Sequence, residues 1–227
     1  MNKIYWAVIL VSTYGFFSLS VANAEPANDS ASAITKLPEL TPDNVSAPTP
    51  KLMDIVDFTQ LRNEFGKRSD FQMRCELSRP TKEWAEAMQA KKFRESSEIL
   101  DKWFDKCPVD ARAHLWAIAS LKELGELEKI EQHKRWWFGL TDSILQTGDG
   151  KSPQTAFVTI SISEEYAMLV RLNLQRVKQQ LINGPPLVDL IVAEQVGGGE
   201  DKHSVYFNPQ WHFIRLMHME AELKKSK

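Results

Sequence analysis

The organisation of the chain is clearest in two stretches of its sequence, FRESSEILDKWF at residues 93–104 and LEKIEQHKRWWF at residues 127–138. They lie 34 residues apart, and the same shift brings further residues into register. The superposed pairs are Ala85 with Ala119, Phe93 with Leu127, Trp103 with Trp137, and Phe104 with Phe138. A fixed period of this length indicates a structural unit that is present twice.

A period of 34 residues is typical of tetratricopeptide-type helical hairpins, in which each helix pair buries its apolar face against the next. It predicts four helices with breaks at Pro108 and Gly125. Their expected ranges are 81–89, 93–106, 111–123 and 127–146. Two features depart from the pattern: tryptophans stand where small residues are usual, and Lys91 is the counterpart of Gly125. Because such repeats need about three units, the hairpins must also pack against another element.

Five tryptophans lie between residues 84 and 137. A large aromatic side chain buries about 150–250 Å², so we expect these residues to pack between the hairpins and compensate for the short stack. A ligand-binding aromatic groove is the alternative interpretation. Apolar residues at helical spacing predict one more helix within residues 54–66, ending at Gly66.

The pattern changes after Gly150 from helical spacing to alternation. A strand is expected at residues 155–161, a helix at 164–172 with Ser163 as N-cap, strands at 175–182, 187–196 and 203–207, and a closing helix at 209–224. This order gives a largely antiparallel sheet around one crossover helix. The predicted fold class is α+β: a helical, tetratricopeptide-like region at residues 54–147, packed on an α/β segment at residues 148–224.

Several short motifs carry a family resemblance. They are ILQTGDG at residues 144–150, TAFV at 155–158, EEY at 164–166 and VYF at 205–207. With these motifs the chain resembles the domain-of-unknown-function family catalogued as 4919, an uncharacterised bacterial family. The resemblance covers residues 54–207, is looser over 54–80, and includes Gln179 and Asp189 in a strand, turn and strand. It implies helical hairpins that lead into a short α/β segment, and it implies no established activity.

Composition excludes several classes of protein. The 227 residues carry 28 Lys and Arg against 30 Asp and Glu, and 43% are apolar. These values exclude a wholly disordered chain and a polytopic membrane protein. The nearly balanced charge also excludes a nucleic-acid-binding protein, which needs a clustered positive field.

The N-terminal region predicts export. Residues 1–24 have a basic start at Lys3, an apolar stretch at 4–21, and the small-residue site Ala22-Asn23-Ala24, as in a secretory signal peptide. Retention of this segment as a membrane anchor is the alternative; after cleavage, no stable membrane span is expected. Residues 25–53 hold five prolines and no aromatic residue, which predicts a disordered linker. The mature protein is therefore expected in the periplasm or secreted.

Cys75 and Cys107 are the two cysteines of the chain. An even pair in an oxidising compartment predicts a disulfide. Closing a loop of this length contributes roughly 3–4 kcal/mol to stability. A metal or redox site is the weaker alternative, because no histidine or second cysteine stands beside either residue.

Asp149 is one candidate for chemistry. Between Gly148 and Gly150 it could offer a carboxylate to a cation, or the glycine backbone could bind an anion. The favoured interpretation is a glycine cap at the end of a helix, followed by a turn.

Glu165 is the other candidate, with Glu164 before it and Tyr166 after it. A carboxylate pair could act as acid and base, but adjacent helix residues diverge by about 100°. Favourable negative charge at a helix N-terminus is the favoured interpretation. If the protein is an enzyme, Asp149 and Glu165 are the first residues to mutate.

The histidines give no metal motif. They are His114, His133, His203, His212 and His218, and none forms an i, i+4 pair. No metal and no cofactor are therefore expected, and no nucleophile elbow is present.

Three functions remain. The leading hypothesis is a non-enzymatic exported module whose hairpins bind another envelope protein or a peptide, by analogy with other helical repeats. The first alternative is an envelope hydrolase or other enzyme with its site at the seam between hairpins and sheet. The second is a purely structural role, in which the α/β segment caps the hairpins within a larger assembly.

Overall fold

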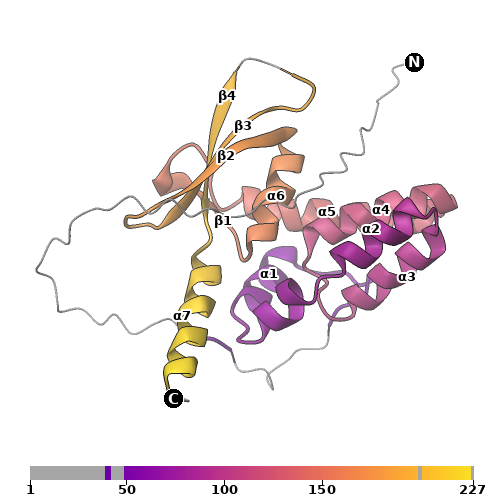
Figure 1. Ribbon diagram of the computed structural model, residues 1–227, viewed down its shortest axis with the longest axis horizontal. Coiled ribbons are helices and arrows are strands. Elements are labelled where there is room, and N and C mark those ends of the chain that lie inside the picture. The colour runs from indigo at the N-terminus through magenta and orange to yellow at the C-terminus, as the bar shows by residue number, and fades with distance from the viewer. Residues whose placement is uncertain (1–38, 42–48, 199–200, 226–227) are drawn as a thin grey trace, which may run out of the picture. The chain divides into compact units, whose positions relative to one another are not determined.

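The structure is a computed structural model that describes residues 39–41, 49–198 and 201–225 (Figure 1). All of these belong to one compact unit, Leu37–Lys227. The expected signal peptide at residues 1–24 lies outside the described residues, as does most of the expected linker at 25–53.

Four helices form the repeated region, each packed against the next along the chain (Figure 1). They are α2 (Thr81–Gln89), α3 (Phe93–Phe104), α4 (Ala111–Leu124) and α5 (Leu127–Leu145). Their ends agree with the predicted ends to within two residues, because local signals mark them. The Asp110 side chain accepts a hydrogen bond from the Ala113 N–H and caps α4.

The turns that follow α2 and α4 have the same geometry 34 residues apart. Gly125 has φ +71°, and its counterpart Lys91 has φ +58°. After α2, the Lys92 N–H donates to the Ala87 carbonyl, and after α4 the Glu126 N–H donates to the Leu121 carbonyl. Both turns are Schellman caps. The repeat therefore extends to the backbone even where the glycine is missing.

The tryptophans divide between core and surface. Trp103 and Trp136 are buried, as packing between the hairpins predicts. Trp84, Trp116 and Trp137 are half-buried and pack against the same core. Trp103 and Trp137 occupy equivalent positions in the 34-residue repeat, but only Trp103 is buried. On α5 the buried tryptophan is the neighbouring Trp136.

Helix α1 (Phe58–Gly66) precedes these hairpins and packs on α5. Its N-cap is Asp57, so the helix begins later than the predicted start at residue 54, and Ile55 lies outside it, 98% exposed. The Phe58 ring lies edge-on to Trp136, with ring centroids 5.3 Å apart. This contact packs α1 against α5 at the edge of the helical region.

Two residues of the expected linker contact the helical region. The Thr41 N–H donates to the Lys67 carbonyl at 2.8 Å, and the Thr41 carbonyl accepts from the Ser69 N–H at 3.0 Å. The Leu52 carbonyl accepts from the Trp136 indole N–H at 2.8 Å. At these positions the expected linker is therefore held against the helices.

The predicted disulfide between Cys75 and Cys107 is confirmed. Cys75 lies in a π-helical turn (Gln72–Leu77), which periodicity did not predict, and Cys107 follows α3. Both are buried. The bridge therefore joins the segment after α1 to the loop between α3 and α4.

The second half forms a four-stranded sheet in the order β1-β4-β3-β2. Its elements are β1 (Phe157–Val158), α6 (Ile162–Arg171), β2 (Leu174–Ile182), β3 (Val188–Gln195), β4 (Lys202–Asn208) and α7 (Gln210–Lys225). Only β1 and β4 are parallel. The predicted α+β class and the order strand, helix, three strands, helix are confirmed.

Two local predictions in this half are wrong. The strand expected at 155–161 is reduced to two residues, because a 3₁₀ turn (Pro153–Thr155) precedes it and α6 begins soon after it. The N-cap of α6 is Ser161 rather than Ser163: the Ser161 hydroxyl accepts from the Glu164 N–H. The Ser163 hydroxyl instead donates to Asp110 at 3.5 Å.

Candidate functional site

Helix α6 joins the two halves, because it contacts α4, α5 and β2. A buried ion pair fixes its first turn. The Arg62 guanidinium of α1 donates to both carboxylate oxygens of Glu164, at 2.8 and 3.2 Å, and each residue is 2% exposed. Arg62 also donates to the Ser143 hydroxyl, and the Ile160 N–H donates to Glu164. Glu164 therefore orients α6 and has no lone pair directed at solvent.

Glu165 points the other way, to the sheet. The Gln179 side-chain amide on β2 donates to Glu165 at 3.3 Å and to Asp189 on β3 at 3.1 Å. The Tyr166 hydroxyl donates to the side-chain amide oxygen of Gln179 at 3.0 Å. Glu165, Asp189, Gln179 and Tyr166 thus form one hydrogen-bonded cluster, which we call the carboxyl cluster.

Burial controls the charge of this cluster. It raises the pKa of Glu165 well above its ordinary value, and the neighbouring Asp189 charge raises that pKa further. The pKa of Asp189 is also raised, again mainly by burial. Two close carboxyl groups cannot both ionise readily, so the more deeply buried Glu165 is the one that favours the protonated form. Such a pair could in principle exchange protons with a substrate, but Glu165 is 0% exposed.

A row of stacked rings and guanidinium groups lies at the surface beside the carboxyl cluster. The Trp84 ring of α2 stacks on Trp116 of α4, with centroids 5.0 Å apart. The Arg112 guanidinium lies 5.5 Å from the centroids of both Trp116 and Tyr166. On β2, the Arg176 guanidinium lies 5.6 Å from the Tyr166 ring. We call these five residues the aromatic–arginine strip; it crosses from the hairpins to the sheet.

A shallow pocket of about 200 Å³ opens beside the strip. Its charged or titratable lining includes Glu76, Arg79, Arg112 and His212. Arg79 donates to Asp110 at 2.7 Å, and Glu76 lies 3.5 Å from the His212 ring. Burial lowers the pKa of Arg112, and the nearby charge of Arg79 lowers it further. The positive charge of Arg112 is therefore destabilised by burial and by its neighbour Arg79.

Asp149 lies in a different loop, and the prediction that its flanking glycines cap a helix is wrong. Helix α5 ends at Leu145, and Gly148 and Gly150 do not cap it. Instead, the Asp149 and Gly150 N–H groups both donate to the Thr155 carbonyl, at 3.0 and 2.8 Å. A Cβ at Gly148 would lie 2.3 Å from that same oxygen. The glycines allow this close approach, and only the predicted turn is found.

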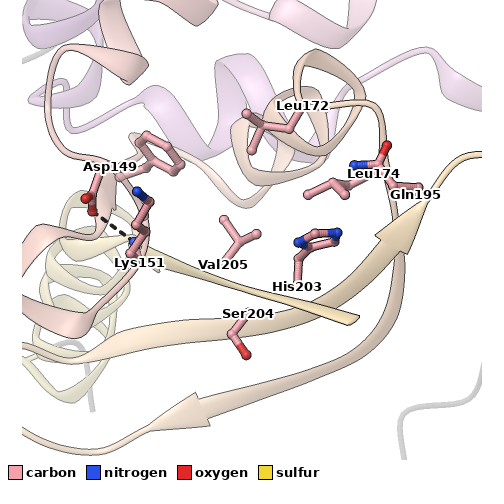
Figure 2. Close-up of a pocket in the computed structure, with 10 residues that line it drawn as sticks. Asp149, Lys151, Leu172, Leu174, Gln195, His203, Ser204 and Val205 are labelled. Carbon is pink, nitrogen blue, oxygen red and sulfur yellow. Dashed lines mark hydrogen bonds between the residues drawn. The ribbon is translucent and has the colours of Figure 1, made fainter. Parts of the chain in front are cut away.

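The Asp149 carboxylate closes this turn. It accepts from the Thr155 hydroxyl at 2.6 Å and from the Lys151 N–H at 3.0 Å. The Thr155 bond, with the Lys151 bond second, lowers the pKa of Asp149. Figure 2 shows Asp149 at one side of a pocket of about 220 Å³ that His203 and Val205 also line. Asp149 lines this pocket and not the one beside the strip, whereas the fully buried Glu165 lines neither, so no pocket brings the two candidate residues together.

Two histidines form a buried pair that sequence spacing did not reveal. His114 Nδ1 and His133 Nδ1 are 2.9 Å apart, and His114 Nε2 lies 2.9 Å from the Pro108 carbonyl oxygen. Since only an N–H can face that carbonyl, His114 Nδ1 accepts and His133 Nδ1–H donates. Burial lowers the pKa of His114 to about 4 and that of His133 to about 3. Both rings are therefore neutral near pH 7.

Two kinds of feature are absent from the described residues, a metal-binding cluster and a membrane-spanning helix. Within them, no group of three or more His, Cys, Asp or Glu side chains is placed to hold a metal ion. None of the described helices combines the length and apolar character needed to cross a membrane.

Most of the site escaped prediction because its members come from different elements. Arg112 and Trp116 stand four residues apart on a predicted helix, so their contact could have been found from i, i+4 spacing. The partners of Glu165 could not, because Gln179 and Asp189 become diagonal neighbours only through the register in which Leu181 pairs with Asp189.

Comparison with known proteins gives one result. No curated protein and no solved structure matches the chain. The model of a family described as Domain of unknown function (DUF4919) matches residues 70–211. This range includes the disulfide, helices α2 to α5, the strip and the carboxyl cluster, but the match does not extend to residues 54–69, which hold α1 and which the resemblance had included. The chain therefore belongs to the DUF4919 family.

Proposed function

We propose that this protein is an exported interaction module that binds another envelope protein or a peptide through the aromatic–arginine strip. The strip itself is the observation that carries the proposal. Trp, Tyr and Arg are the residue types enriched in the parts of interfaces that contribute most binding energy. Here Trp84, Trp116, Tyr166 and Arg112 are half-buried and Arg176 is exposed, so a partner can reach them.

The strip is also held in place before any partner arrives. The Trp84 indole N–H donates to the Ser120 hydroxyl at 3.1 Å, and the Tyr166 hydroxyl is fixed by Gln179. Arg112 is held between two rings. Side chains that are already ordered lose little conformational entropy on binding, which favours affinity. If the hairpins are of the tetratricopeptide type, Trp84, Arg112 and Trp116 are the part of the strip that belongs to the repeat stack.

An experiment with a photo-reactive phenylalanine analogue tests this proposal. The analogue replaces Trp84 in one variant and Leu127, which is 74% exposed on α5, in the control. We expect a cross-linked partner from Trp84 that is absent from Leu127 and is lost when Trp116→Ala is added. Equal cross-linking at both positions, or the same products with Trp116→Ala, would contradict binding through the strip.

Export is the part of the proposal that the sequence and the disulfide support. A signal peptide at residues 1–24 directs the chain to an oxidising compartment, where the Cys75–Cys107 bridge persists. We expect the protein isolated from the cell envelope to begin at Glu25, as checked by N-terminal mass spectrometry. An uncleaved N-terminus at Met1 would favour a retained anchor.

A hydrolase is the second candidate function, and the carboxyl cluster is the observation that favours it. A protonated Glu165 beside Asp189 has the chemistry of an acid and base pair. It ranks second because Glu165 is fully buried, and only Tyr166 of the cluster lines the pocket. Hydrolysis of an envelope ester or glycoside that is abolished by Glu165→Gln, with the fold intact, would reverse this ranking.

A further inference from the structure

Arg112 differs from Arg79 in the same pocket lining, because none of the described carboxylates is paired with its guanidinium. Within the described part of the chain, its guanidinium makes no hydrogen bond or ion pair, although Asp110 is two residues away. The carboxylate oxygens of Asp110 are already occupied by other donors. These are the Arg79 guanidinium, the Trp103 indole N–H, the Ala113 N–H and the Ser163 hydroxyl.

The other charges around the pocket define what could balance Arg112. Arg79 is neutralised by Asp110, and Glu76 faces His212 at 3.5 Å and Arg215 at 4.0 Å. One cation is therefore left over. The carboxylate of Glu76 in the same lining would repel an anion with two charges. The charges thus favour an anion with a single negative charge.

The dimensions of the pocket favour an inserted side chain over a free metabolite. Its volume is about 200 Å³, whereas pockets for small molecules usually measure about 300–1,000 Å³. The Trp84–Trp116 stack continues from Arg112 along the surface, which provides apolar contact for the residues that flank an inserted side chain. The planar fork of a guanidinium matches a carboxylate in two-point hydrogen bonding.

We propose that the Arg112 pocket binds one carboxylate, supplied by an aspartate or glutamate side chain of a peptide segment that lies on the aromatic–arginine strip. The inference rests on the proposed function and specifies the partner chemistry of that same surface. Arg112 forms the charged hydrogen bonds, and Trp84 and Trp116 contact the neighbouring residues of the segment.

A pair of capped peptides tests this inference: acetyl-AAEAA-amide and its neutral counterpart acetyl-AAQAA-amide. Binding to the oxidised protein is followed by NMR, using the indole N–H signals of Trp84 and Trp116. We expect the glutamate peptide to bind at least tenfold more tightly than the glutamine peptide. Arg112→Gln should abolish that preference. The matched control is Arg94→Gln, which removes the same charge from an exposed site on α3 and should keep it.

Several outcomes would overturn the inference. They are equal affinity for the two peptides, an unchanged preference in Arg112→Gln, and inorganic phosphate displacing the glutamate peptide at equal concentration, which would indicate a general anion site. If Arg112→Gln fails to fold by circular dichroism, Arg112→Lys replaces it and should weaken the preference, because it keeps the charge but loses the fork. Equal affinity of the natural protein for the two peptides, together with intact cross-linking from Trp84, would refute this inference alone and leave the proposed function standing.

Discussion

At the scale of single residues, Lys91 stands in a backbone conformation that suits glycine. Its φ is +58°, and its repeat counterpart Gly125 has φ +71°. A residue with a Cβ in the left-handed region costs roughly 1–2 kcal/mol. We therefore expect Lys91→Gly to raise the free energy of unfolding by about 0.5–1 kcal/mol, measured as a higher urea midpoint with an unchanged m-value.

Gly125→Ala is the matched control for Lys91→Gly. No atom lies within 4 Å of a Cβ built at Gly125, so the substitution changes only the backbone preference. It should lower the free energy of unfolding by about 1 kcal/mol. If Lys91→Gly is also destabilising, the side chain of Lys91 contributes more than the strained φ costs.

The two residues that the sequence offered as candidates for chemistry lie in different surroundings. The sequence singled out Glu165, and the structure places it in a buried cluster with a raised pKa. The sequence also singled out Asp149, whose carboxylate instead closes a local turn. The difference is physical: hydrogen bonds within six residues can be read from turn chemistry, whereas the environment of Glu165 depends on two strands that follow later in the chain.

At the scale of the helices and strands, prediction succeeded where local signals mark the ends. Gly125 and Asp110 set the limits of α4 from residues within or beside it. The strand at 155–161 failed because alternation alone does not show whether a neighbour is present to pair with; only Phe157 and Val158 lie against β4. The π-helical turn at Gln72–Leu77 was not predicted, because its register is set by the packing of Phe71 and Cys75 into the core.

The disulfide provides a prediction at this same scale, because it fastens the π-helical turn to the α3–α4 loop. It closes a loop of 32 positions, which restricts the unfolded chain. Replacing both cysteines with serine should lower the free energy of unfolding by roughly 3–4 kcal/mol. Urea unfolding at pH 7 checks this, with the reduced natural protein as the control. Equal stability of oxidised and reduced protein would show that the bridge adds nothing.

At the scale of the whole molecule, the sequence predicted a helical half and an α/β half, but not the ion pair that connects them. Periodicity separates helices from strands, and so it predicted α+β. The joint depends on Arg62 of α1 reaching Glu164 of α6, 102 positions later. Either residue alone looks like an ordinary surface charge in the sequence. Their pairing is a consequence of the fold, so no local pattern could have indicated it.

The molecule also contains three buried titratable residues, a histidine pair and a glutamate, whose effects on the pH dependence of stability oppose each other. The pKa of His114 is lowered to about 4 and that of His133 to about 3, so in the unfolded state they bind protons below about pH 6.5 while the folded state does not. Their contribution is complete above pH 6.5 and is lost as the pH falls. The raised pKa of Glu165 acts in the reverse sense: its contribution is complete below pH 4.5 and is lost as the pH rises.

Two variants separate these contributions. His133→Gln can still donate to His114 Nδ1 but does not titrate. The difference in free energy of unfolding, variant minus natural protein, should therefore increase by about 1 kcal/mol per pH unit as the pH falls from 6.5 to 4. For Glu165→Gln, the same difference in free energy of unfolding should increase as the pH rises above 4.5. Urea midpoints from pH 4 to 8 measure both differences. Parallel curves for His133→Gln and the natural protein would mean that His133 keeps an ordinary pKa in the folded state, and parallel curves for Glu165→Gln would mean the same for Glu165.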